Sequence, residues 1–102
     1  MQPFIAEKRE QIAELCRKHH VRRLSIFGSA VRDDFDPSRS DVDLRVEFDP
    51  LAAIAYAANY FALLDAFVDL FERKVDLLSS PVIRNPYLKK EIESTQELLY
   101  AA

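Results

Sequence analysis

The segment 41–48 alternates strictly between apolar and charged residues, and this pattern constrains the fold more than any other feature of the chain. Successive side chains of a β-strand point to opposite faces of a sheet, so a period of two residues predicts a strand with one packed face and one wet face. The packed face carries Val42, Leu44, Val46 and Phe48, and the wet face carries Asp41, Asp43, Arg45 and Glu47. We therefore expect a sheet that packs on one side of this strand and meets water on the other.

Helical and strand patterns alternate along the rest of the chain. Apolar residues recur at steps of three and four in three segments, which predicts helices, and two short apolar or alternating segments predict strands. The predicted helices are 4–19, 51–71 and a last one from Pro86, and the predicted strands are 22–27 and 75–78. Asn85 is the expected N-cap of the last helix, with Pro86 at its first position. A short helix is also expected after Gly28, so the order is helix, strand, short helix, strand, helix, strand, helix.

Each long predicted helix has a side that we expect to pack on the sheet. Its members are the apolar residues at helical spacing. In chain order they are Ile5, Ile12, Leu15 and Cys16; then Leu51, Ile54, Ala58, Phe61, Leu64 and Val68; then Leu88, Ile92 and Leu99. Cys16 is the only cysteine, which excludes an internal disulfide and makes buried packing its expected role.

Composition excludes several classes of protein. The 102 residues have room for one domain, 1–102, since domains commonly run about 100 to 150 residues. Hydrophobic residues make up 49% and charged residues 30%, which is the balance of a soluble globular protein. A formal net charge of -3 argues against direct nucleic-acid binding, which needs clustered Lys and Arg. The sequence has neither a signal peptide nor an apolar run near the roughly 18 residues of a membrane span, so we expect a cytoplasmic protein without membrane contact.

Two aspartates at the start of the alternating strand are the first candidates for chemistry. Asp41 and Asp43 are two residues apart and so share one face, with side chains rooted about 7 Å apart. Mg²⁺ takes oxygen ligands and is usually shared between one or two carboxylates and substrate phosphates, so it would offset their repulsion. Asp76 is the natural third carboxylate, because it alone interrupts an apolar strand, and three carboxylates could hold two ions. The plainer alternative is that the Asp-x-Asp pair is only the solvated side of an edge strand.

The only glycine, Gly28, stands where the strand 22–27 ends, and Ser29 follows it. A glycine lets the backbone come close to a phosphate, and the start of a helix supplies unpaired N–H groups and a favourable dipole. Taken alone, Gly28 could equally be a turn residue and Ser29 an N-cap. Together with a carboxylate pair on the next strand and a third carboxylate on another, the two residues favour a triphosphate site.

These residues resemble the motif set of the minimal nucleotidyltransferases, single-domain relatives of the polymerase-beta superfamily. The motifs that carry the resemblance are Phe27-Gly28-Ser29, Arg32, Ser40-Asp41-Val42-Asp43-Leu44 and Val75-Asp76-Leu77. The resemblance implies the nucleotidyltransferase fold, of the α/β (α+β) class, with a small mixed β-sheet of three to four strands packed with about four helices. It also implies roles for six residues: nucleotide binding by Gly28, Ser29 and Ser40, and catalysis with Mg²⁺ binding, of two ions, by Asp41, Asp43 and Asp76.

Proteins of this family are typically antitoxins encoded beside a helical toxin of the HEPN ribonuclease class, and some transfer AMP from ATP to a tyrosine of that toxin. The resemblance therefore predicts an ATP-dependent protein adenylyltransferase with a HEPN-type toxin as its partner. In one alternative, the protein neutralises the toxin by direct binding and its nucleotide site is vestigial. In another, it transfers a nucleotide to a small molecule such as an antibiotic, which is less favoured because such enzymes generally add a domain or a dimer partner.

Two interpretations remain open for each of four basic residues near these motifs. Arg32 could contact phosphate, or it could pair with an acidic residue of its own turn. Arg84, Lys89 and Lys90 stand near the start of the last helix, against its dipole. They could serve nucleotide or partner binding, or simply form a solvated surface.

Overall fold

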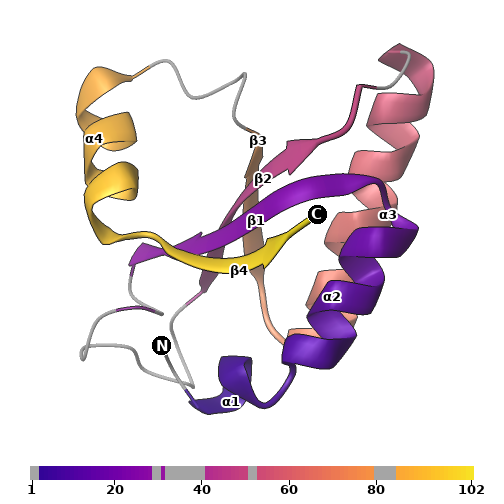
Figure 1. The fold of residues 1–102 in the computed structure, drawn as a ribbon, viewed down its shortest axis with the longest axis horizontal. Coiled ribbons are helices and arrows are strands. Elements are labelled where there is room, and N and C mark those ends of the chain that lie inside the picture. The colour runs from indigo at the N-terminus through magenta and orange to yellow at the C-terminus, as the bar shows by residue number, and fades with distance from the viewer. Residues whose placement is uncertain (1–2, 29–30, 32–40, 51–52, 80–84) are drawn as a thin grey trace.

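In the computed structural model, the described residues (3–28, 31, 41–50, 53–79 and 85–102) form a four-stranded sheet with helices on both sides (Figure 1). The strands are β1 (Val21–Phe27), β2 (Val42–Phe48), β3 (Val75–Ser79) and β4 (Glu97–Ala101), in the order β3-β2-β1-β4 across the sheet. β1 runs antiparallel to both β2 and β4, whereas β2 and β3 are parallel. The sheet is therefore mixed, which confirms the predicted α/β (α+β) class.

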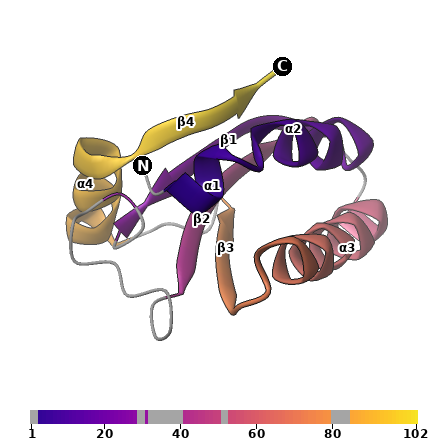
Figure 2. The ribbon, with the colours of Figure 1, turned by 90° about the horizontal axis from the view of Figure 1, so that it is seen from below.

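The helices divide between the two faces of this sheet. α1 (Pro3–Ala6) and α2 (Arg9–Lys18) precede β1, α3 (Ala53–Phe71) connects β2 to β3, and α4 (Pro86–Thr95) lies between β3 and β4. A helix is the usual link between parallel strands, because such strands need a crossover connection. Figure 2 shows α2 and α3 on one side of the sheet and α4 on the other. One face thus has a full helical cover, while the opposite face meets a single short helix.

The face toward α2 and α3 holds the hydrophobic core. Along β2 the predicted alternation is confirmed, since Val42, Leu44 and Val46 are fully buried and the residues between them are half-buried. The core cluster consists of Ile5, Ile12, Cys16, Val21, Leu24, Ile26, Val42, Leu44, Val46, Leu63, Phe67, Phe71, Val75, Leu77 and Leu99. Cys16 is buried as predicted, and burial raises the pKa of its thiol to about 12.

The prediction of one continuous helix over 4–19 was wrong. α1 ends at Ala6 and α2 begins at Arg9. Packing at the end of α3 accounts for the separate first helix: the Phe4 ring contacts Phe71 edge-on with centroids 6.3 Å apart, and the Arg73 guanidinium lies 4.4 Å from the Phe4 ring centroid. Helical spacing of apolar residues cannot reveal such a break, because tertiary contacts decide it.

The buried side predicted for the long helix was also wrong. Leu63, Phe67 and Phe71 face the core, whereas Phe61 is 60% exposed and Val68 37% exposed. Ala58 is exposed and Leu64 half-buried, while Leu51 and the side chain of Ile54 lie outside the described residues. The helix is apolar around almost its whole circumference, so periodicity alone could not choose which side packs.

The C-terminal segment contains a strand that the sequence analysis missed. α4 begins at Pro86 with the Asn85 side chain accepting hydrogen bonds from two backbone N–H groups, as predicted, but it ends at Thr95. β4 then pairs with β1, and Leu99, predicted to lie on the helix, is buried on this strand. A segment this short carries too little pattern to predict a strand, and pairing with β1 decides its conformation.

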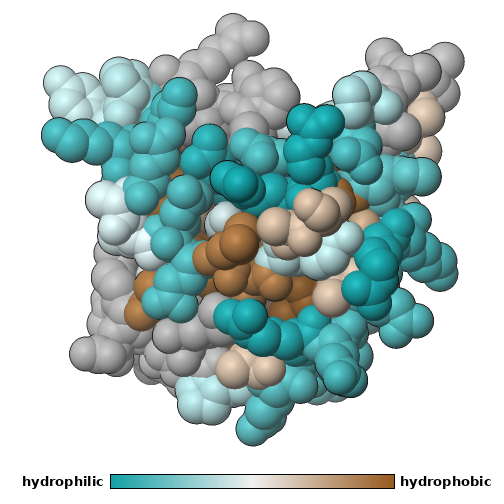
Figure 3. Space-filling model, in the orientation of Figure 1, coloured by the Kyte–Doolittle hydropathy of each residue, from teal (hydrophilic) through white to brown (hydrophobic). Residues whose placement is uncertain are grey.

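The visible surface is mostly hydrophilic, with apolar side chains gathered toward the middle of the face shown in Figure 3. Large apolar side chains that stay exposed among the described residues are Phe61, Val68, Tyr87, Leu88 and Leu98. Within the same part of the chain, no helix combines the length and apolar character needed to cross a membrane.

Candidate active site

Strand register brings two of the predicted carboxylates together. Asp43 on β2 and Asp76 on β3 are directly opposite partners in the parallel pair. Opposite residues on neighbouring strands point to the same face, and the strands are about 4.8 Å apart. Both aspartates are half-buried, and both lie on the face opposite the buried Leu44 and Leu77. Asp76 therefore shares a face with Asp43, as the sequence analysis requires.

Gly28 lies directly against this carboxylate pair. Its φ is +70°, in the region that residues with a side chain rarely adopt, and a Cβ added to it would lie 2.5 Å from Oδ2 of Asp43. The Val31 N–H donates a hydrogen bond to the Gly28 carbonyl at 3.1 Å. Glycine is thus required twice, by its backbone conformation and by the neighbouring carboxylate.

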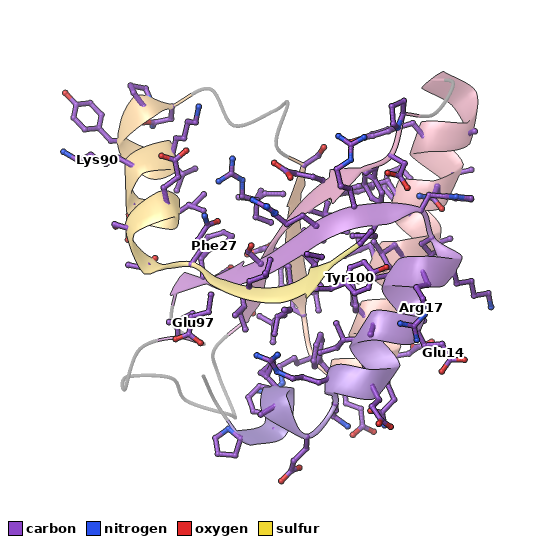
Figure 4. The ribbon with its side chains drawn as sticks, viewed as in Figure 1. Glu14, Arg17, Phe27, Lys90, Glu97 and Tyr100 are labelled. Atoms are coloured by element: carbon purple, nitrogen blue, oxygen red, sulfur yellow. The ribbon has the colours of Figure 1, made fainter. Side chains whose placement is uncertain are left out.

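These residues line a cavity of about 290 Å³ between the sheet and α4, which we call the carboxylate cavity. Its lining residues are Phe27, Gly28, Asp43, Asp76, Leu78, Leu88, Glu91 and Ile92. Figure 4 shows Phe27 on the side of the sheet that faces α4. α4 therefore supplies one wall of the cavity and the sheet supplies the other.

Glu91 is a carboxylate at this cavity that the sequence analysis missed. It projects from α4 three residues after Leu88, which is the spacing of one helix face. That spacing was the available signal, because Leu88 and Ile92 were already predicted to face inward.

Asp41 is placed differently from the other two predicted carboxylates. It immediately precedes β2, and its Oδ2 lies 3.6 Å from Nζ of Lys74. It is not among the residues that line the carboxylate cavity. Across the part of the chain that the structure describes, no three His, Cys, Asp or Glu side chains gather as a ready metal cage. The structure thus brings together Asp43 and Asp76 and leaves Asp41 beside a lysine.

Several of the predicted binding residues lie outside the described residues. They are Ser29, Ser40, Arg32 and Arg84. Lys89 and Lys90 are both exposed on α4, and Figure 4 shows Lys90 pointing away from the sheet. Of the predicted nucleotide-binding residues, the structure therefore places Gly28 alone.

Two tyrosines on α3 hold the strand that carries Asp76. The Tyr60 hydroxyl donates a hydrogen bond to the Leu77 carbonyl, and the Tyr56 hydroxyl is hydrogen-bonded to the Ser79 hydroxyl. Burial, followed by the neighbouring Tyr56 and Asp76, raises the pKa of Tyr60, which keeps its phenol protonated as a donor. These tyrosines are one helical turn apart, and they fasten β3 on the core side of the sheet.

The donor set of the cavity fits a hard divalent cation. Asp43 and Asp76 offer only oxygen ligands, and the sheet holds them side by side, where their like charges repel. Mg²⁺ prefers such carboxylate oxygens and leaves positions for water and phosphate. The residues present therefore suit a site at which a metal-bound polyphosphate would lie between the sheet and α4.

A family profile described as "Polymerase beta, Nucleotidyltransferase" matches residues 10–102. The chain belongs to this nucleotidyltransferase family. Two proteins of Methanocaldococcus jannaschii, each named as a candidate protein adenylyltransferase, are similar in sequence to it. One is 38% identical over 86 residues, which cover 84% of this chain and 82% of the relative. The other is 34% identical over 98 residues, which cover 88% of this chain and 94% of the relative.

Solved structures of nucleotidyltransferases share the fold. A candidate minimal nucleotidyltransferase, 27% identical, superposes with a TM-score of 0.65 over 90% of this chain and 89% of its own. A tri-AMPylated HEPN toxin of Shewanella oneidensis in complex with an MNT antitoxin gives a TM-score of 0.65 at 19% identity, over 96% of this chain and 73% of that one. A toxin–antitoxin structure with AMP-PNP gives 0.67 at 20% identity, over 92% and 73%. At these low identities the last two show the common fold alone.

Proposed function

We propose that this nucleotidyltransferase is a Mg²⁺-dependent protein adenylyltransferase that transfers AMP from ATP to a tyrosine hydroxyl of a HEPN-type toxin and thereby acts as its antitoxin. The observation that carries the proposal is the side-by-side placement of Asp43 and Asp76 against Gly28. The names of the Methanocaldococcus jannaschii relatives and of the MNT–HEPN complex support the choice of a protein acceptor.

In this proposal, the triphosphate binds at the turn that follows β1, where Gly28 admits the phosphates and Ser29 and Ser40 supply further hydrogen bonds. Asp43 and Asp76 would hold Mg²⁺ together with Asp41. Bound there, the ion would supply positive charge to neutralise the phosphates at the α-phosphorus.

The transfer itself is a single displacement at the α-phosphorus. The tyrosine oxygen forms a bond to that phosphorus as the bond to the bridging oxygen breaks, and pyrophosphate leaves with the electron pair. Asp76 accepts the proton of the tyrosine hydroxyl and passes it to water. Most of the acceleration comes from positioning the reactants in a site of fixed charges.

Asp41 must leave Lys74 to join the metal ligands. Its ion pair has a gap of 3.6 Å, and the Lys74 side chain is 72% exposed. An exposed pair of this kind contributes little to stability, so exchange of the lysine for a cation costs little. Lys74 is therefore a weak competitor of a divalent cation for Asp41.

Direct masking of the toxin is the second candidate function. It is favoured by apolar side chains left in water, with Phe61 60% exposed and Tyr87 85% exposed. Such side chains commonly anchor protein interfaces. In this version the protein neutralises the toxin by contact and needs no nucleotide.

One experiment separates the two functions. The purified protein is incubated with the HEPN-type toxin encoded beside it, Mg²⁺ and each nucleoside triphosphate in turn, and the intact mass of the toxin is measured. We expect a gain of one or more AMP units with ATP, reduced at least about a hundredfold in rate by Asp43→Asn.

The matched control is Asp65→Asn, because Asp65 is exposed on α3 on the other side of the sheet. It should transfer AMP like the unchanged protein. Full neutralisation of the toxin without ATP and without any mass gain would discard the enzymatic proposal in favour of masking.

A further inference from the structure

A second cavity lies beside the carboxylate cavity on the same face of the sheet. It measures about 250 Å³, and we call it the arginine cavity. Its lining residues are Arg23, Ser25, Arg45, Glu47, Glu93 and Gln96.

The register of β1 and β2 makes the two cavities neighbours. Phe27 is opposite Asp43 at the carboxylate cavity, and the next same-face pair along the strands is Ser25 opposite Arg45. The last turn of α4 and the residue after it wall the arginine cavity, just as earlier turns of α4 wall the first. The two cavities thus follow one another along the strand pair, and α4 contributes to the lining of both.

Two arginines and two glutamates line the arginine cavity, and Ser25 and Arg45 are among its most buried groups. The Arg45 side chain is only 15% exposed and Ser25 is 4% exposed, whereas the Glu93 side chain is 50% exposed at the rim. A ligand that passes Glu93 at the rim therefore reaches a guanidinium and a hydroxyl, with the half-buried Glu47 also in the lining.

The contacts of Arg45 with α4 are long. Its Nη1 lies 3.5 Å from Oε1 of Gln96 and 4.0 Å from Oε1 of Glu93, compared with about 2.8 Å for a good charge-assisted hydrogen bond. A guanidinium has five N–H donors and binds a carboxylate in a two-pronged fashion. An incoming carboxylate can therefore bind Arg45 more closely than these two contacts do.

We propose that the arginine cavity binds an acidic side chain of the acceptor protein, two residues away from the hydroxyl that receives the nucleotide. This inference rests on the proposed function. Arg45 follows Asp43 by two residues on one strand, so their side chains are rooted about 7 Å apart on one face. Residues i and i+2 of an extended acceptor segment have the same spacing and also point to one side. An acceptor of the form Tyr-x-Glu or Glu-x-Tyr thus places its hydroxyl at the carboxylates and its acid on Arg45.

A nucleoside fits this cavity less well than a side chain does. Pockets that enclose drug-sized ligands run about 300–1,000 Å³ and are mostly apolar. The arginine cavity, at about 250 Å³, is smaller, and no aromatic or aliphatic residue is among its lining residues. Its size and polarity suit one charged side chain with its flanking backbone.

The test uses short synthetic peptides with one tyrosine and with Glu, Gln or Lys two positions before or after it. The full-length protein, ATP and Mg²⁺ are supplied, and AMP transfer is followed by mass spectrometry. We expect the Glu peptide to react at least about tenfold faster than the Gln peptide, with the Lys peptide slowest. Arg45→Glu should reverse the order, and Arg45→Gln should remove the preference while the KM for ATP stays unchanged.

Arg22→Ala is the matched control, because Arg22 is an exposed arginine of β1 that pairs with Asp49 at 3.5 Å outside the cavity. It should keep the order of the unchanged protein. If Arg45→Glu keeps the order Glu, Gln, Lys among the peptides, the inference is overturned. It is also overturned if the Arg45 variants change only the KM for ATP, because that result would assign the cavity to the nucleotide. If Arg45→Glu does not fold, the ranking of the three peptides by the unchanged protein still decides, since equal rates overturn the inference.

Peptide binding is scored separately from transfer, by NMR shifts of the Ser25 and Gln96 amides in the presence of Mg²⁺ and a non-hydrolysable ATP analogue. Shifts that depend on the Glu residue and vanish in Arg45→Gln support the inference even if no AMP is transferred to the peptide. The same shifts together with no AMP transfer to the toxin would overturn the proposed function alone. Transfer to the toxin that is indifferent to Arg45 would overturn the inference alone.

Discussion

The two faces of the sheet are built from alternate residues of the same strands, yet they differ in burial and in charge. On the face toward α2 and α3, Val42, Leu44 and Val46 are fully buried. On the face toward α4, charged residues of β2 remain half-buried beside two cavities. The comparison teaches that one face supplies the stability that allows the other to hold like charges together. Substitutions on the two faces should therefore fail in different ways.

The largest effect on the free energy of unfolding is expected from removing a buried side chain on the face toward α2 and α3. Phe67 is fully buried and stacks on Phe71 with ring centroids 5.9 Å apart. Phe67→Ala should lower the free energy of unfolding by about 3–5 kcal/mol, because it removes apolar contacts and leaves a cavity. Urea denaturation followed by circular dichroism measures the change.

The same helix offers the control for this prediction. Phe61 is 60% exposed, so Phe61→Ala should change the free energy of unfolding by no more than about 0.5 kcal/mol. Similar losses in the two variants would mean that α3 packs with a different side toward the sheet.

Gly28 lies beside the carboxylates on the face toward α4. Its replacement is expected to have the next largest effect. Gly28→Ala puts a methyl group against the Asp43 carboxylate and forces a positive φ on a residue with a side chain. We expect a loss of about 1–3 kcal/mol in the free energy of unfolding, with AMP transfer falling as well. Calorimetry and the mass assay on one preparation check both. An alanine variant of unchanged stability would show that the turn after β1 can move away from the carboxylate.

The covered face could be predicted from the sequence only in part. The alternation over 41–48 identified which residues of β2 are buried, because a period of two admits a single assignment of faces. The apolar side of α3 could not be identified in this way, since Phe61 and Phe67 are equally apolar and only contact with the sheet distinguishes them.

For the site face, the sequence predicted the aspartates but not their surroundings. Asp76 was predicted as a site residue because a lone charge in an apolar strand is costly unless it is paired or binds a metal. The Lys74 partner of Asp41 and the pairing of Ser25 with Arg45 depend on contacts between residues far apart in the sequence. These long-range pairings leave no local pattern.

The third substitution is expected to raise the free energy of unfolding, whereas the first two lower it. Asp76→Asn keeps the shape of the side chain and removes the repulsion between it and Asp43. In EDTA we expect the free energy of unfolding to rise by about 1 kcal/mol, while AMP transfer is lost. Excess Mg²⁺ should then raise the unfolding temperature of the unchanged protein more than that of the variant, because a cation that binds only the folded state stabilises it.

Asp69→Asn serves as the control here, as an exposed aspartate on α3 that should leave both the stability and the Mg²⁺ effect unchanged. An Asp76→Asn variant that is destabilised in EDTA and still gains fully from Mg²⁺ would mean that the two carboxylates do not share an ion.

The smallest effect on the free energy of unfolding is expected from a residue that lies on neither face of the sheet. Glu72, at the turn between α3 and the strand that carries Asp76, has a φ of 52° and is exposed. Glycine adopts this conformation without a steric penalty, so Glu72→Gly should raise the free energy of unfolding by about 0.5 kcal/mol after the cost of a more flexible unfolded chain. Glu72→Ala removes the same charge but keeps the strained φ, so the difference between the two variants isolates the backbone contribution. Because the turn touches neither cavity, AMP transfer should stay within about twofold in both variants. A glycine variant no more stable than the alanine variant would show that this turn relaxes into another conformation, and a fall in transfer would show that the turn helps to position Asp76.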